Sequence, residues 1–231
     1  MRGIGAAIEE RLALRPIWRA LFLRLIPPGV GWRYTLGFAT LFVFIAQVVT
    51  GMFLALYYAP TPDHAYDSVQ FITRDAAFGS FVHALHHWGA SAMVVLVIAH
   101  LAVVFALGAY KYPREATWAV GVVLLVLTLG LSFTGYLLPW DEKAYWATVV
   151  GTNIPGTVPL VGGFLVRLVR GSADIGALTL TRFYAMHALI LPSLLALFAV
   201  GHLYLVMRHG VSVPPALWER GEASAAGDRD A

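Results

Sequence analysis

The chain has 231 residues, of which 59% are hydrophobic and 13% are charged, and its formal net charge is +3. This composition excludes an ordinary soluble domain and predicts an integral membrane protein that contacts lipid. The chain has no cysteine, which excludes disulfides, thiolate metal sites, iron–sulfur clusters and thioether-linked haem within it. Basic residues lie mainly at the ends of apolar segments, so we expect them to orient the chain in the membrane and not to bind nucleic acid.

Residues 1–28 are predicted to form an amphipathic helix on the membrane surface. Arginines are interspersed with apolar residues in this segment, and Pro27 and Pro28 end it. Residues 29–213 are predicted to form the transmembrane domain, and residues 214–231 a polar, disordered C-terminal tail.

Four uncharged runs are long enough to cross a bilayer as helices, which takes about 20 residues. We predict spans at residues 33–57, 79–109, 115–137 and 183–208. A fifth uncharged stretch, residues 144–166, is interrupted by glycine and proline and is expected to form short helices in an outer loop. The expected fold is therefore all-α, with four transmembrane helices. The charge distribution places both termini in the cytoplasm, and a bacterial plasma membrane is expected.

Histidines recur at similar spacings on the second and fourth spans. His86 and His100 are 14 residues apart, which places them within about 40° of one helix face and about 21 Å apart along it. His187 and His202 are 15 apart, and a kink or wide turn at Pro192 would absorb the extra residue. Because both spans run in the same direction, His86 lies level with His187, and His100 with His202. Two facing imidazoles at each of two depths suit two six-coordinate haem irons.

Glycines repeat this spacing on the first and third spans. Gly37 and Gly51 are 14 residues apart, and so are Gly121 and Gly135. Glycine lets a flat macrocycle approach the backbone closely, because it has no β-carbon. These spans run the opposite way, so Gly51 and Gly135 match the outer histidine pair, and Gly37 and Gly121 the inner pair. One such pair would commonly serve helix packing, but four matched pairs predict a diheme bundle.

Distinctive motifs surround the four histidines. His86 begins "HHWGAS", and the other three motifs are "KYPREATWAVGVVL", "GYLLPWDEKAYW" and "GSADIGALTLTRFYAMHALILP". On these motifs, over about residues 5–213, the chain resembles the N-terminal half of cytochrome b, and most of all the cytochrome b6-like branch of that family. The 14 and 15 spacings favour that branch over the mitochondrial type, which keeps 14 on both helices.

The resemblance implies an electron-transfer subunit of a quinol:cytochrome c, or plastocyanin-like, oxidoreductase that works by a Q cycle in a respiratory or photosynthetic chain. It implies two noncovalent haem b groups, an outer low-potential one held by His86 and His187 and an inner high-potential one held by His100 and His202. Quinol would be oxidised near the outer face and quinone reduced near the inner face.

The resemblance also implies partner proteins. These are a subunit IV-like C-terminal half of cytochrome b, a Rieske iron–sulfur protein, a c-type cytochrome and a second copy of the complex in a homodimer. Part of the quinol site would lie in the subunit IV-like partner. The chain alone is therefore expected to have no catalytic residues of its own and no activity.

Some positions depart from the family pattern. The family carries an arginine three residues before its first ligand, where this chain has His83, and another three residues after His100, where this chain has Val103. These losses leave His83 and Arg114 as candidate contacts for haem propionates. Thr35 stands where cytochrome b6 has a cysteine that binds a covalent haem c, so no covalent haem is expected.

The outer loop after the third span is implied to contribute to the quinol pocket. Four residues are candidates for this role: Tyr136, Pro139, Trp140 and Trp146. The charged residues between the tryptophans, Asp141, Glu142 and Lys143, are expected to be solvated at the membrane boundary.

Two other interpretations stay open on the sequence. The chain could be a diheme membrane anchor of a quinone-linked dehydrogenase or hydrogenase, which would have no Rieske partner. From another class, it could be a haem-free transporter whose histidines line a proton path. Copurifying subunits would distinguish the first, and a haem count the second.

Overall fold

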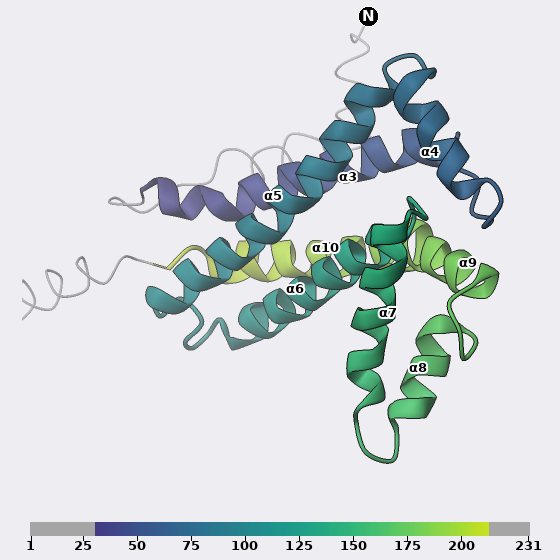
Figure 1. Cartoon of the computed structure of the whole chain (residues 1–231). Coiled ribbons are helices and arrows are strands. Elements are labelled where there is room, and N and C mark those ends of the chain that lie inside the picture. The colour runs from purple at the N-terminus through teal and green to yellow at the C-terminus, as the bar shows by residue number, and fades with distance from the viewer. Residues whose placement is uncertain (1–30, 213–231) are drawn as a thin grey trace, which may run out of the picture.

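The computed structural model describes residues 31–212 (Figure 1). All regular secondary structure within these residues is helical. The predicted surface helix, residues 1–28, and the predicted tail, residues 214–231, lie outside the described residues. In chain order the helices are η1 (Trp32–Thr35), α3 (Leu36–Ala55), α4 (Ala65–Arg74), α5 (Gly79–Ala106), α6 (Glu115–Tyr136), α7 (Glu142–Gly156), α8 (Gly162–Arg170), α9 (Ala177–Ala185), η2 (Met186–Ile190) and α10 (Leu191–His209).

Four helical segments are long and apolar enough to cross a membrane, as the sequence predicts. They are Trp32–Ala55, Gly79–Ala106, Glu115–Tyr136 and Ala177–His209. The first three agree with the predicted spans to within three residues at each end. The fourth begins six residues earlier than predicted, because the helix continues through the charged residue Arg182. The Arg182 guanidinium donates a hydrogen bond to the Leu168 carbonyl of a neighbouring helix at 2.9 Å.

The four spans form two helix pairs that face one another. Helices α3 and α5 pack together in the upper half of Figure 1, and α6 and α10 pack together below them. Helix α5 also contacts α6, so the two pairs form one bundle. The all-α, four-span fold predicted from the sequence is confirmed.

Short helices occupy the stretch that was predicted not to cross the membrane. Helices α7 and α8 form a hairpin after α6, and neither is long enough to be a candidate span (Figure 1). Helix α7 begins at Glu142 because the Asp141 side chain accepts a hydrogen bond from the Ala144 amide at 2.7 Å. Glu142 and Lys143 are exposed as expected, as is Asp141, but Asp141 has this capping role in addition.

Helix α4 was not predicted, because its segment was assigned to an outer loop. Ala65 and Ile72 are its buried residues, seven positions apart on one face. This amphipathic spacing was the available signal.

The main hydrophobic cluster lies at the end of the bundle that is predicted to be the outer one, where α3 and α6 end. Its buried members are Ala65, Leu137, Leu180 and Phe183. The Tyr58 hydroxyl donates to the Leu138 carbonyl at 2.6 Å, and burial, helped by nearby Tyr184, raises the pKa of this hydroxyl. Few apolar side chains of the spans are buried, and many are exposed, as expected for surfaces that face lipid or partner subunits.

Candidate cofactor sites at two histidine levels

The four predicted histidines lie in two pairs between the helix pairs. At the outer level, near the C-terminal ends of α3 and α6, the ring centroids of His86 and His187 are 6.0 Å apart with the planes at 78°. At the inner level, toward the opposite end, His100 and His202 line one cavity. The structure therefore brings together the residues that the helix spacing pairs.

A π-helical segment accommodates the longer histidine spacing on the fourth span. This segment, Met186–Ile190, contains His187 and directly precedes α10, which begins at Leu191 and Pro192. A π-turn holds one more residue than an α-turn, so 15 residues here cover the rotation that 14 cover on α5. The predicted wide turn at Pro192 is confirmed.

Each histidine ring faces a glycine on the neighbouring helix. The pairs are Gly51 with His86, Gly135 with His187, Gly37 with His100, and Gly121 with His202. A β-carbon on these glycines would lie 3.2, 2.5, 3.1 and 3.4 Å, respectively, from Cε1 of the facing ring. The glycines thus make room for the imidazole rings, in addition to any room that they leave for a macrocycle.

Hydrogen bonds to Thr50 and Gln47 orient His86. The Thr50 hydroxyl donates its single proton to the Ala46 carbonyl at 2.7 Å. In its 2.9 Å contact with Nδ1 of His86 the hydroxyl oxygen is therefore the acceptor, and Nδ1–H is the donor. Nε2 of His86 then carries the lone pair that a metal ion needs. The Gln47 amide also donates to the backbone carbonyl of His86 at 3.1 Å, in a notch that a side chain at Gly89 would close.

Groups on α6 orient His187 in the same way as Thr50 orients His86. Its Nδ1 donates to the Leu131 carbonyl at 3.0 Å, and the Thr134 hydroxyl lies 3.5 Å from the same nitrogen. Because a carbonyl can only accept, Nδ1 carries the proton and Nε2 the lone pair. The two outer histidines therefore share the tautomer of metal-bound imidazole.

The distance between the ring centroids of the outer pair agrees with that of two imidazoles bound to one metal ion. With a metal–nitrogen distance of about 2.0 Å, as for zinc, and an imidazole radius of about 1.1 Å, two trans imidazoles have centroids about 6.2 Å apart. The observed centroid distance is 6.0 Å. His86 and His187 therefore fit a bis-histidine haem iron.

The inner pair lies in a mostly apolar cavity of about 350 Å³, within the usual size range of ligand pockets. His100 and His202 line it together with Gly37 and Gly121. Within residues 31–212, Nδ1 of His202 makes no hydrogen bond of standard geometry, although the Thr117 backbone interacts with this imidazole. The inner site thus has space for a planar group, and the hydrogen bonding of His202 is weaker than that of the two outer histidines.

The other candidate residues lie around the two histidine levels. His83 is half-buried on α5, one turn before His86, and His87 is exposed next to Trp88. Arg114 lines the inner cavity and donates to the carbonyls at the end of α10, at 3.3 Å to Gly210 and 3.4 Å to His209. The hydroxyl of Thr35 donates to the backbone of η1.

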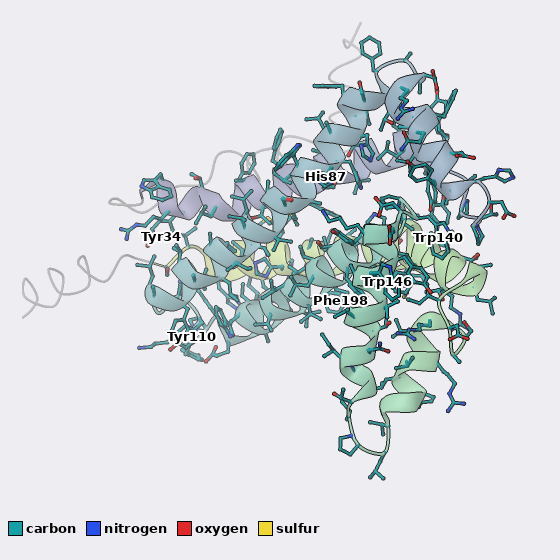
Figure 2. The ribbon with its side chains drawn as sticks, viewed as in Figure 1. Tyr34, His87, Tyr110, Trp140, Trp146 and Phe198 are labelled. Atoms are coloured by element: carbon teal, nitrogen blue, oxygen red, sulfur yellow. The ribbon has the colours of Figure 1, made fainter. Side chains whose placement is uncertain are left out.

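The candidates for the quinol pocket lie at the outer end. Figure 2 shows Trp140 and Trp146 at the opposite end of the molecule from Tyr34 and Tyr110. Tyr145 connects the two tryptophans, with ring centroids 6.3 Å from Trp140 and 5.4 Å from Trp146. Trp140 also packs on the outer hydrophobic cluster, whereas Trp146 and Tyr136 are exposed, and Pro139 is half-buried.

Several residues of these sites were not predicted. Thr50, Thr134 and Gln47 orient the outer pair, and Arg33 lines the inner cavity. The signal for the threonines was available, since each directly precedes a glycine that was singled out. No sequence signal identified Gln47, because its contact depends on how α3 meets α5.

Comparisons with known proteins agree with this geometry. The family description "Cytochrome b/b6/petB" matches residues 22–210. The chain is 42% identical over 206 residues to cytochrome b6 of Euglena gracilis, covering 89% of this chain and 96% of that protein. Its structure is similar, with a TM-score of 0.85 and 32% identity, to a chain of a solved hyperthermophilic respiratory Complex III. That match covers 92% of this chain and 57% of the solved chain, so this chain spans little more than half of its length.

Proposed function

Since this chain belongs to the cytochrome b/b6 family, we propose that it holds two noncovalent haem b groups, one at each histidine level. It is a cytochrome b subunit of a quinol oxidoreductase of the bc or b6f type. The observation that carries the proposal is the outer histidine pair, whose separation and hydrogen bonding suit one shared iron. Family membership sets aside the dehydrogenase anchor and the haem-free transporter.

At the outer level, His86 and His187 are the residues that would hold a haem iron, through Nε2. Thr50 and the Leu131 carbonyl hold the two rings in the required tautomer, and Gly51 and Gly135 give the rings access to the space between the helix pairs. Bis-histidine ligation leaves no open iron position for oxygen or substrate. When bound, each haem supplies a one-electron carrier.

At the inner level, His100 and His202 are the proposed ligands, with Gly37 and Gly121 behind their rings. Arg114, at the mouth of the cavity, is a proposed contact for an inner haem propionate. His83 is the corresponding candidate at the outer level. No covalent haem c is proposed, because Thr35 provides no thiol and the chain has no cysteine.

We further propose that the chain carries electrons from an outer quinol-oxidation site to an inner quinone-reduction site, as in a Q cycle, with the lower potential at the outer haem. Inward transfer of one electron against the membrane potential costs about 2.3 kcal/mol per 100 mV for a full crossing, so quinol oxidation must drive it. Four residues are proposed contributors to the outer quinol site: Tyr136, Pro139, Trp140 and Trp146.

The proposed partners are a subunit IV-like C-terminal half, a Rieske iron–sulfur protein and a c-type cytochrome, in a homodimeric complex. The subunit IV-like half would complete the quinol site, so the chain alone is proposed to be inactive. We place the complex in a bacterial plasma membrane with both termini of the chain in the cytoplasm, on the basis of the charge distribution.

A haem count on the purified complex tests the central proposal. The pyridine haemochrome assay should give two haem b per chain, and acid–acetone extraction should remove both, because neither is covalently attached. One haem b per chain, or haem that stays with the protein after extraction, would contradict the proposal. Recovery of a Rieske protein and a three-span subunit in the same preparation tests the proposed partners.

A further inference from the structure

The inner cavity is apolar along its length and positively charged at one end. Among the described residues that line it, the charged ones are Arg33 and Arg114, and none is acidic. Arg33 lies in η1, just before α3, and Arg114 directly precedes α6. Both therefore stand at the inner mouth, the end at which Figure 2 shows Tyr34. The cavity suits an apolar ligand that carries negative charge at its inner end.

The two arginines differ in what they already bind. Arg114 donates to two backbone carbonyls after α10, those of His209 and Gly210. No hydrogen bond or ion pair ties the Arg33 side chain to the other described residues. Among the described lining residues, the exposed Arg33 guanidinium is therefore the cation that remains available to a ligand at this mouth.

A hydroxyl next to Arg33 also lacks a partner. The Tyr34 oxygen is buried and has no hydrogen bond within the described part of the chain, and the same holds for the Thr117 hydroxyl. Both residues line the cavity. A buried hydroxyl without a partner costs about 1–3 kcal/mol, so a ligand oxygen at the mouth would be stabilised by these donors.

On the opposite wall of the cavity, α5 has an uncharged residue where a cation would reach the mouth. Val103 lines the same cavity on α5, three residues after His100, at a position where related sequences carry an arginine. The valine gives α5 no charge at the mouth, and η1 supplies one from across the cavity.

Resting on the two-haem proposal above, we propose that Arg33 and Tyr34 form an anion anchor that holds a carboxylate of the inner haem. The planar guanidinium can bind a carboxylate through two parallel N–H···O bonds, and the Tyr34 hydroxyl can donate a third. This anchor orients the haem with its carboxylates toward the inner mouth. It replaces an arginine at position 103.

Charge removal at Arg33 with a matched control tests the anchor in the assembled complex. Arg33→Gln should lower the midpoint potential of the inner haem, because the positive charge favours the reduced form. The expected shift is about tenfold in the ferric-to-ferrous ratio at fixed potential, or about 59 mV for one electron. Lys111→Gln removes an exposed charge at the same membrane face from a residue outside the cavity lining, and screening should keep its effect below about twofold.

A rescue variant makes the test specific to position. In Arg33→Gln/Val103→Arg, the new side chain extends along the cavity to its mouth and should restore most of the inner-haem shift. Equal effects of Arg33→Gln and Lys111→Gln, or no recovery in the double variant, would overturn the anchor. If the complex with Arg33→Gln alone does not assemble, the complex with the double variant should still assemble. Failure of the double variant to assemble would also overturn the anchor.

The wild-type complex separates this inference from the two-haem proposal. If its redox titration shows no second b haem, the two-haem proposal fails before Arg33 is considered. If both haems titrate and Arg33→Gln leaves the inner one unchanged, the anchor alone is wrong.

Discussion

At the outer level, Nδ1 of both His86 and His187 has a hydrogen-bond partner at 3.0 Å or less, whereas at the inner level His202 has only a weaker interaction with the Thr117 backbone among the described residues. The outer pair also lies close to the main hydrophobic cluster, which includes Phe183 of the same span as His187. The inner pair lies in an open cavity of about 350 Å³. The same arrangement of helices thus yields one site with strong hydrogen bonds to its histidines and one site with weaker support for His202.

This difference has a chemical consequence. A hydrogen bond from Nδ1–H makes an imidazole a more basic ligand and fixes its orientation. More basic ligands stabilise ferric iron, which agrees with the lower potential proposed for the outer haem. The inner site instead offers positive charge at its mouth, from Arg33 and Arg114, and positive charge favours the reduced form.

Helices α3 and α6 show how the contrast arises from similar sequences. Each carries a Thr-Gly pair at the outer level, Thr50–Gly51 and Thr134–Gly135. The Thr50 hydroxyl lies 2.9 Å from its histidine and the Thr134 hydroxyl 3.5 Å from the other, where the Leu131 carbonyl is the closer acceptor. The same dipeptide therefore has a stronger contact on α3 than on α6.

Removing one ligand should have the largest effect and should separate the two levels. We expect His187→Ala or His86→Ala to abolish the outer haem and His100→Ala or His202→Ala the inner one, because each iron would lose one of two axial ligands. Optical redox titration of each purified variant, with haem content, measures this. Loss in a crossed pattern, His86 together with His202, would mean that the pairing is wrong.

Filling the two glycine sites on α6 should affect His187 more than His202. In Gly135→Ala the new methyl would lie 2.5 Å from Cε1 of His187, whereas in Gly121→Ala it would lie 3.4 Å from that of His202. We expect Gly135→Ala to cost about 1–3 kcal/mol, seen as a lower temperature of outer-haem loss in absorbance melting. Gly121→Ala serves as the control, and an equal loss in both variants would contradict the proposed difference.

Thr50→Val should act on the outer haem alone. The substitution keeps the shape of the side chain but removes the acceptor for Nδ1–H of His86, so the ligand becomes less basic and less firmly oriented. We expect about tenfold weaker haem binding and a higher outer midpoint potential, measured by haem transfer to an apo-acceptor and by redox titration. Thr148→Val is the matched control, since the buried Thr148 hydroxyl donates within its own helix and lies outside the inner cavity lining; a like shift there would refute the role of Thr50.

Tyr58→Phe should have the smallest effect and tests the packing of the outer end. Losing the hydrogen bond to the Leu138 carbonyl should cost about 0.5–1.5 kcal/mol of stability. Because the pKa of Tyr58 is raised in the folded chain, the unfolded chain releases this proton first, so the stability contributed by Tyr58 falls as the pH rises above about 10. Absorbance melting from pH 8 to 11 should show a flatter alkaline decline in Tyr58→Phe, and identical slopes would contradict the assignment.

The span positions and the pairing of the four histidines could be predicted from the sequence because they depend on helix geometry alone. A fixed rise and rotation per residue convert a spacing of 14 into a depth and a face. The extra residue between His187 and His202 was likewise readable, since Pro192 marked where a wide turn could form. Helix α4 was missed because a short amphipathic helix between two spans has a weak signal.

What surrounds the four rings depends on contacts between helices that are distant in the sequence. Spacing cannot indicate that the Thr50 hydroxyl accepts from His86, that Leu131 offers its carbonyl to His187, or that Arg33 faces the same cavity as Val103. Such contacts require the distance and rotation between packed helices to within a few tenths of an ångström. The sequence alone determined the four spans and the two histidine levels, because local helix geometry is periodic. Only the tertiary structure decided how differently the two levels are supported, because that depends on how side chains meet across the helix pairs.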